Sequence, residues 1–370
     1  MANYRLISSD SHVYEPADLW DRYIDPEFQE RAPRLVHELD TDQWYADGNV
    51  KFGVVGTNQQ AGLRYEDPDK ITMEGRYSDA PAGGWDPHAH VADLDVDGVS
   101  GSVLYPSVGL NAFKLPASDL VSAIFRGYNT WLSEFCQYYP DKLKGIALVN
   151  VDDILSATYE LRRAAGLGLV GVVISMRPSG PSYAHPSYDD LWALSQDLHM
   201  PISLHVGTSR WRAESAGTLL DQLVEQTTRD AYPRNAIASM IFSGVFERFP
   251  NLRVGTAEFG LAWAPFFLER MDHLYTERAT VFQVHRFAHG SLPSDVFRNN
   301  VFLSFQEDEL GIQLRHHVGV ENLLWGSDYP HAESTFPRSR AVLEEILVGV
   351  PAEEQAKIAG QNTAWLYGYS

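Results

Sequence analysis

The chain has 370 residues, of which 44% are hydrophobic, so it is large enough for one big domain or two ordinary ones. Its formal net charge of −20 argues against nucleic acid as a partner, because phosphates would be repelled, and against anionic membrane surfaces. No apolar run approaches the roughly 20 residues of a membrane span, and no basic region precedes an apolar one at the N-terminus. With Cys136 as its one cysteine, placed in a helical pattern, we expect a cytoplasmic protein with a buried thiol and no internal disulfide.

Short apolar runs rich in β-formers alternate with longer amphipathic segments, which is typical of βα units. The predicted strands are residues 4–9, 99–105, 145–150, 169–174, 201–204, 252–257, 301–305 and 322–327. The predicted helices include residues 118–139, 153–165, a segment from about residue 188, and 234–249. This α/β order predicts a (β/α)8 TIM barrel, with residues 1–370 forming a single domain.

Residues 25–90 form a long insertion between the first two predicted strands. The chain is about 120 residues longer than the ~250 typical of the fold, and much of the excess lies here. The segment is rich in Gly, Pro, Asp and aromatic residues and has no sustained period. Because it leaves the C-terminal end of the first strand, we predict a lid or pocket wall on the catalytic face. A decorative or oligomer-forming insertion is the alternative.

Three predicted strands lead into residues of the kind that bind divalent metals. Asp10 and His12 follow the first strand at positions i and i+2, so both point to the same side. His205 ends the fifth strand, and Asp328 follows the eighth. Since the C-terminal ends of barrel strands meet at one mouth, these four residues predict a metal site there. Two His and two Asp suit Zn²⁺, with Mn²⁺ or Fe²⁺ as alternatives.

The same residues lie in segments that resemble the amidohydrolase superfamily, in the branch of aminocarboxymuconate semialdehyde decarboxylase and the hydroxybenzoate decarboxylases. The resemblance implies a TIM barrel with a divalent metal, a small carboxylic acid or aromatic substrate, and a homodimer. It is carried by Asp-Ser-His-Val-Tyr-Glu-Pro at 10–16, Pro-Ile-Ser-Leu-His at 201–205 and Trp-Gly-Ser-Asp-Tyr-Pro-His at 325–331, together with residues 93–99 and 258–272.

The chain departs from this superfamily at two strands. Dinuclear members carry a carboxylated lysine on the fourth strand, but residues 169–174 contain no lysine, so we expect one metal ion. At the sixth strand, where relatives often have histidine, the chain has Glu258. We predict Glu258 to be a ligand or an acid, base or water-positioning group, with a structural ion pair as the alternative. His331, three residues past Asp328, is predicted to face the same mouth.

Other candidates carry weaker signals. Glu15 is predicted either to orient His12 or an arginine, or to cap the helix near Pro16. His88 and His90 show no partner pattern and are expected at the surface. Arginine is the residue type that binds a substrate carboxylate bidentately, and we consider three of them, of which Arg270 falls in a predicted helix and is expected to be structural. These arginines are Arg177, Arg210 and Arg270.

A mononuclear site of this kind serves two reaction classes. In hydrolysis, a metal-bound water is the nucleophile and Asp328 or Glu258 transfers its proton. In decarboxylation, one of the same two residues protonates the carbon that carries the carboxylate. The resemblance favours non-oxidative decarboxylation of an aromatic or enolic carboxylic acid. Hydrolysis of an amide, ester or C–C bond is the alternative, and a metal-stabilised binding protein is a third.

Five aromatic residues of the insertion bear on the substrate class. They either line a pocket for an aromatic substrate or form a small satellite core, which is the commoner fate of such residues. They are Trp44, Tyr45, Tyr65, Tyr77 and Trp85.

Overall fold

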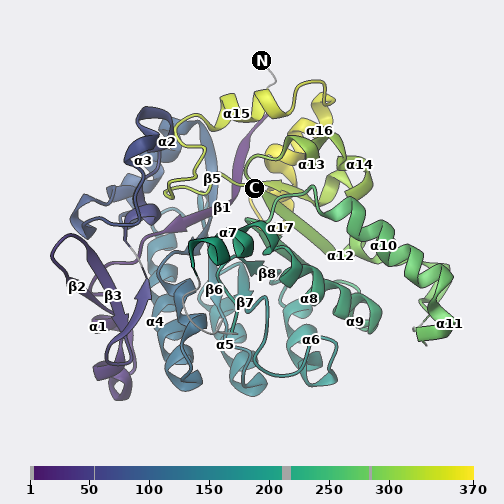
Figure 1. Ribbon diagram of the computed structural model, residues 1–370, viewed down its shortest axis with the longest axis horizontal. Helices are drawn as coiled ribbons and strands as arrows, with labels where there is room; N and C mark the ends of the chain where they lie inside the picture. The colour runs from purple at the N-terminus through teal and green to yellow at the C-terminus, as the bar shows by residue number, and fades with distance from the viewer. Residues whose placement is uncertain (1–3, 54, 211–217, 283–285) are drawn as a thin grey trace.

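Eight parallel strands form the centre of the computed structural model, which describes residues 4–53, 55–210, 218–282 and 286–370 (Figure 1). They follow one another in chain order around a single sheet, as a TIM barrel requires. Each predicted strand has a counterpart, so the predicted fold class is confirmed. The strands are β1 (Leu6–Val13), β5 (Val99–Pro106), β6 (Leu143–Leu148), β7 (Gly171–Ile174), β8 (Ile202–His205), β9 (Val254–Ala257), β10 (Val301–Phe305) and β11 (Leu323–Trp325).

The strand β1 is longer than predicted and contains Asp10 and His12 instead of ending before them. Its pairing with β5 shifts register between Ser8 and Ser11. The Ser8 hydroxyl fills this irregularity by donating a 2.9 Å hydrogen bond to the Asp10 carbonyl. Such an irregularity re-aims the side chains around it, and here it contains Asp10 and directly precedes His12.

The two ends of the sheet, β1 and β11, meet through a seam of short contacts. The Asp328 N–H donates to the Asp10 carbonyl over 2.8 Å. Below it, the hydroxyls of Ser8, Ser11 and Ser327 lie 2.8 to 3.2 Å from one another. A Cβ on Gly326 would lie 2.6 Å from the Asp10 Cβ, so the close approach of the two backbones depends on glycine here. The seam therefore brings the Asp10 and Asp328 backbones side by side.

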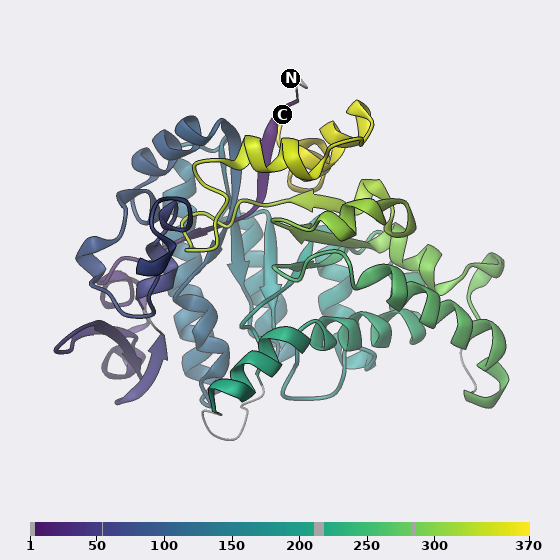
Figure 2. The ribbon, with the colours of Figure 1, turned by 45° about the horizontal axis from the view of Figure 1, so that its top comes forward.

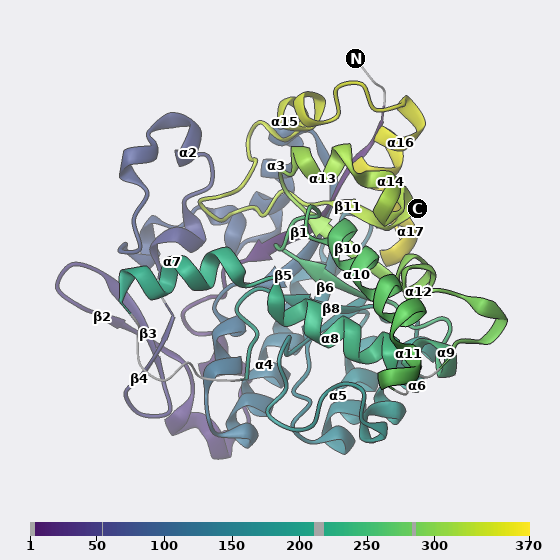
Figure 3. The ribbon, with the colours of Figure 1, turned by 45° about the vertical axis from the view of Figure 1, so that its right-hand side comes forward.

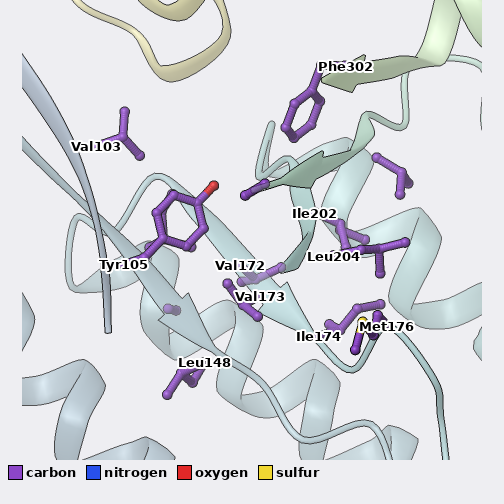
Figure 4. Packing of buried hydrophobic residues seen from close by; sticks show 14 of the residues in the cluster. Val103, Tyr105, Leu148, Val172, Val173, Ile174, Met176, Ile202, Leu204 and Phe302 are labelled. Carbon is purple, nitrogen blue, oxygen red and sulfur yellow. The ribbon is translucent and has the colours of Figure 1, made fainter. Parts of the chain in front are cut away.

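Apolar side chains of the parallel strands fill the barrel interior, and Figure 4 shows part of this packing around β5 to β8. Each of these strands is buried on both faces, as the near-continuous apolar runs predict. The Tyr105 hydroxyl within this core lies 2.8 Å from the Ser203 hydroxyl, so its polar end is satisfied. The packed interior gives the residues at the mouth a rigid base.

Helices surround the barrel (Figure 1). The predicted helix 234–249 is wrong as a single unit, because Gly244 has a φ of 73° and separates α8 from α9. Among the described residues, no helix combines the length and apolar character needed to cross a membrane. The main helices are α4 (Ser118–Gln137), α5 (Ile154–Gly166), α6 (Asp189–Asp197), α7 (Leu219–Thr228), α8 (Ala231–Phe242), α9 (Val245–Arg248), α10 (Ala264–Glu277), α11 (Ala279–Phe282), α12 (Pro293–Asn300), α13 (Glu309–Gln313), α14 (Arg315–Val318), α15 (Ser339–Ile346), α16 (Ala352–Ala356) and α17 (Asn362–Tyr367).

The insertion contains a small antiparallel sheet beside the barrel (Figure 2). Trp44 is fully buried there, with its ring edge-on to Trp20 at 5.6 Å, and Tyr77 stacks on Tyr14 at 5.0 Å. These two aromatic residues therefore belong to a satellite core. The elements of this part are α1 (Leu19–Tyr23), β2 (Arg34–His37), β3 (Asp42–Ala46), β4 (Val50–Gly53), α2 (Leu63–Glu66), α3 (Pro87–Asp97) and the 3-10 turns Pro26–Arg31, Gly56–Gln59, Pro68–Lys70, Tyr77–Asp79 and Ala82–Gly84.

Two predictions about single side chains have opposite outcomes. Cys136 is buried on α4, as predicted, and burial raises the pKa of its thiol to about 12. The prediction that His90 lies at the surface is wrong. His90 is fully buried on α3, where its Nδ1 lies 2.8 Å from the Gly83 carbonyl and its ring packs edge-on against Tyr329.

Candidate metal centre

Four buried side-chain atoms face one another at the mouth of the barrel. His12 Nε2 lies 3.5 Å from Asp10 Oδ1 and 3.3 Å from Asp328 Oδ1, and His205 Nε2 lies 3.7 Å from Asp10 Oδ1. None of these four atoms forms a hydrogen bond of acceptable geometry among the described residues, although His331 Nδ1 approaches Asp328 Oδ1 to 2.8 Å. A buried polar atom without a partner costs roughly 1–3 kcal/mol, so four such atoms around one point need an occupant. Carboxylates and imidazoles suit a divalent cation, and the ligand atoms that lie within 4.8 Å of one another form two overlapping groups, with Asp10 and His205 in one and Asp328 in the other.

The two histidine rings are held in the orientation that metal binding requires. His12 Nδ1 lies 2.9 Å from the Pro106 carbonyl, and His205 Nδ1 lies 2.9 Å from the Val206 carbonyl. Because a carbonyl only accepts, Nδ1 carries the proton in each neutral ring and Nε2 carries the free lone pair. The backbone therefore aims both lone pairs at the common point.

Glu258 and His331 complete the cluster on its outer side. Glu258 Oε1 lies 3.3 Å from His12 Nε2, and His331 Nδ1 lies 2.8 Å from Asp328 Oδ1. Glu258 shares a tight group of possible ligand atoms with Asp10, His12 and His205, and a second group with His12, Asp328 and His331. The Glu258 and His331 side chains are 14% and 16% exposed, whereas the Asp328 side chain is 3% exposed. All six residues predicted for the site are thus brought together, with these two facing the solvent side.

The backbone is strained at two of these residues. Glu258 and Asp328 have φ values of 67° and 59°, in the left-handed region that side chains other than glycine rarely adopt. Such conformations cost about 1–3 kcal/mol each and persist where the surroundings enforce them. Here the Asp328 N–H is bound to the Asp10 carbonyl, and the Arg229 guanidinium donates a 3.1 Å hydrogen bond to the Glu258 carbonyl. The strain turns both carboxylates into the barrel mouth.

Negative charge is concentrated at the centre. Burial by itself lowers the pKa of His12, but the neighbouring carboxylates of Asp10, Glu258 and Asp328 raise it well above its ordinary value. Burial and the charge of Glu258 raise the pKa of Asp328. Burial, together with the charge of His12, lowers the pKa of His331 to about 3. The same field that favours a proton on His12 attracts a divalent cation.

A pocket of about 720 Å³ opens outward from this centre. Its walls come from the insertion, the loop after β5, the segment after α7, and the loops after β10 and β11. None of the five insertion aromatics considered for substrate binding is among the lining residues within the described chain. The lining residues outside the cluster are Thr57, Asn58, Arg64, Ile71, Met73, Ser107, Leu110, Asn111, Val206, Gly207, Gln226, Arg229, Gln306, Glu307, Ala332 and Glu333.

Glu15 acts through the loop after β5. Its buried carboxylate accepts backbone N–H groups of Ser107, Val108 and Gly109 at 3.3, 2.9 and 2.8 Å. The predicted cap of the helix near Pro16 is therefore wrong, and the predicted orienting of His12 is indirect, through this loop. The loop that it holds begins at the Pro106 carbonyl, which orients His12, and contains the Ser107 hydroxyl, 3.0 Å from His331 Nε2.

Arg210 is a structural residue. Its guanidinium pairs with Asp152 and donates to the carbonyls of Phe113 and Leu115. It therefore fixes the loop after β8, which follows His205, to the loops after β5 and β6, and does not line the pocket. Sequence reasoning instead missed Arg229, which does line it, because a lone arginine in the long segment after β8 carries no distinguishing motif.

Comparisons with known proteins agree with this geometry. The model of the amidohydrolase family matches residues 85–369. The chain belongs to this family. It is 24% identical over 264 residues to 2-amino-3-carboxymuconate-6-semialdehyde decarboxylase of Dictyostelium discoideum, which covers 70% of this chain and 71% of that protein.

Two solved structures share the fold. An amidohydrolase from Mycobacterium avium subsp. paratuberculosis K-10 aligns over 100% of both chains, with a TM-score of 0.78 and 23% identity. A dihydroxybenzoic acid decarboxylase from Polaromonas sp. JS666, solved with bound manganese and the inhibitor 2-nitroresorcinol, aligns over 85% of this chain and 96% of its own, with a TM-score of 0.62 and 18% identity.

Proposed function

We propose that this protein is a metal-dependent, non-oxidative decarboxylase of an aromatic or enolic carboxylic acid. The observation that carries the proposal is the set of four buried ligand atoms of Asp10, His12, His205 and Asp328, the last two of which belong to residues that line an open pocket. The Dictyostelium and Polaromonas relatives, both named as decarboxylases of unsaturated carboxylic acids, supply the reaction class.

The metal ligands in this proposal are Asp10, His12, His205 and Asp328. These residues provide the four unpartnered atoms, whereas Glu258 and His331 are more exposed toward the pocket. We infer one ion, Zn²⁺, from the mixed nitrogen and oxygen donors. The manganese in the Polaromonas enzyme makes Mn²⁺ the alternative.

The remaining side chains supply binding and proton transfer. When bound, the divalent ion supplies positive charge to hold the substrate's carboxylate and adjacent hydroxyl oxygens. The carboxyl group of Glu258 or Asp328 donates a proton to the carbon that bears the carboxylate. The C–C bond then breaks, its electron pair returns to the ring or enol, and CO₂ leaves. His331 lies between Asp328 and the Ser107 hydroxyl and returns a proton to the carboxyl group that has donated one.

The insertion is proposed as a pocket wall. Thr57, Asn58, Ile71 and Met73 line the pocket from this segment, which supports the role predicted for it. Helix α7 lies beside the insertion (Figure 3), and Gln226 at its C-terminal part lines the same pocket. The homodimer implied by the family resemblance stays a prediction.

The test combines metal content with a substrate screen. Elemental analysis of protein purified without added metal is expected to give about one equivalent, largely lost in His12→Ala and Asp328→Ala. The metal-loaded protein is then screened for CO₂ release from hydroxybenzoates and enolic acids, and for hydrolysis of matched amides and esters. Hydrolysis without CO₂ release would replace the decarboxylase by the hydrolase alternative. Failure to bind metal even after reconstitution would exclude both the decarboxylase and the hydrolase.

A further inference from the structure

We propose that Arg229 is an anion-binding residue of the pocket and pairs with the substrate carboxylate through the oxygen that the metal ion would leave free. This inference rests on the proposed function and names the residue that selects an acid over a neutral analogue. Arg229 follows α7, is partly buried and lines the same pocket as Glu258, Asp328 and His331.

The charge balance of the site requires such a residue. Three carboxylates, those of Asp10, Glu258 and Asp328, surround the point where a divalent ion fits. With one of them protonated for proton transfer, the other two balance the ion, so the loaded centre keeps no positive charge for an anion. The chain as a whole, these carboxylates included, carries a net charge of −20. An acid approaching this centre is repelled unless a second cation lies within reach, because interactions in a partly enclosed pocket are weakly screened.

Two arginines line the pocket, and they differ in what they already bind. The Arg64 guanidinium lies 2.7 Å from the Glu307 carboxylate, which compensates its charge, and also donates to the Glu333 carbonyl. Arg229 donates only to neutral oxygens, the Gln226 amide at 2.9 Å and the Glu258 carbonyl at 3.1 Å. Among the described residues, no carboxylate forms an ion pair with it. Within the described part of the pocket, Arg229 is therefore the arginine whose charge no carboxylate compensates.

The geometry of Arg229 suits a carboxylate next to the metal centre. A guanidinium has five N–H donors in one plane, and the two hydrogen bonds at Arg229 leave donors for a further acceptor. Its Nη2 bonds to the backbone of Glu258, whose side chain lies 3.3 Å from His12. A small acid with oxygens at the centre thus has its carboxylate within reach of Arg229, against the apolar side chains of Ile71, Met73 and Leu110.

The test compares an acid with its neutral analogue by calorimetry, independently of turnover. Salicylate and salicyl alcohol differ in the carboxylate alone. The Mn²⁺-loaded wild type is expected to bind salicylate at least about tenfold more tightly, because a charge-assisted pair is lost in the alcohol. Arg229→Gln is expected to lose this preference, while its affinity for salicyl alcohol changes less than about twofold. Arg64→Gln is the matched control and should keep the preference.

Four other binding outcomes overturn the inference. If Arg229→Gln weakened the binding of salicylate and of salicyl alcohol equally, Arg229 would instead be a support for the Glu258 backbone. Loss of bound metal from this variant, measured by elemental analysis, would mean the same. Absence of a salicylate preference in the wild type, or retention of it in the variant, would place anion binding elsewhere. A protein that shows the Arg229-dependent preference but releases no CO₂ from any acid would refute the proposed function and leave the inference standing.

Discussion

The floor and the walls of the pocket are built in opposite ways. The floor consists of Asp10, His12 and His205 on barrel strands, and Asp328 directly past one, all nearly inaccessible and fixed by backbone hydrogen bonds. The walls come from inserted segments, where Met73 is 57% exposed. A rigid floor with replaceable walls keeps the metal chemistry constant while the substrate changes, which is how barrel enzymes diversify. Changes in the floor should therefore act on the metal, and changes in the walls on the substrate.

The largest effect is expected at the seam of the floor. In Gly326→Ala, the new Cβ lies 2.6 Å from the Asp10 Cβ and 2.9 Å from the Asp10 nitrogen, so the strands must separate. We expect a loss of about 1–3 kcal/mol in the free energy of unfolding and loss of bound metal. Chemical denaturation and elemental analysis measure both. Gly166→Ala, where a Cβ meets nothing within 4 Å, is the control, and equal behaviour of the two variants would contradict the role of the seam.

A second effect is expected at His90 on α3, whose ring packs against Tyr329, the residue next to Asp328. Burial lowers the pKa of His90 to about 4, whereas an unfolded histidine titrates near about 6.5. The unfolded chain therefore binds the proton first, and stability falls as the pH drops from about 6.5 toward 4. In His90→Asn, the asparagine amide still offers a donor to the Gly83 carbonyl but does not titrate. The loss of stability that His90 causes at low pH should therefore be absent from this variant.

The His90 contribution is measured as a difference between proteins. The unfolding free energy of wild type relative to His90→Asn should fall by about 2 kcal/mol between pH 7 and pH 5. His88→Asn, an exposed position on the same helix, controls for the substitution itself. A pH-independent difference between wild type and His90→Asn would show that His90 protonates equally in both states.

A smaller effect is expected behind the floor. Glu15→Gln replaces one acceptor oxygen by an NH₂ group that faces backbone N–H groups, so the loop holding Pro106 and Ser107 loosens. Groups that orient metal ligands typically contribute about tenfold to metal affinity, so we expect Glu15→Gln to bind metal about tenfold more weakly than the wild type. Metal titration by calorimetry measures it. Glu160→Gln, a buried carboxylate paired with Arg163, should change stability without changing metal affinity, and the reverse result would contradict the assignment.

The difference between floor and walls also explains what the sequence could predict. The ligands follow or occupy apolar strands, and the period of a strand and the shared mouth of a barrel bring them together by simple rules. Glu258 and His331 were placed correctly for the same reason. The direct partners of Glu15 could not be predicted because they are backbone N–H groups, which leave no pattern in the sequence. Arg229 was missed because the course of the segment after β8 depends on tertiary contacts.

The smallest effect is expected in the wall. Met73 lines the pocket and is not a candidate ligand, so Met73→Ala removes part of an apolar surface and no group from the floor. A partly exposed methionine contributes a fraction of the ~2 kcal/mol of full burial, so salicylate affinity should fall about threefold. Metal affinity should stay unchanged. Calorimetry measures both the salicylate affinity and the metal affinity. Leu39→Ala, 90% exposed in the same insertion and outside the pocket, should change neither. A loss of metal in Met73→Ala would show that wall and floor are coupled, and the insertion would then belong to the metal centre as well as to the substrate pocket.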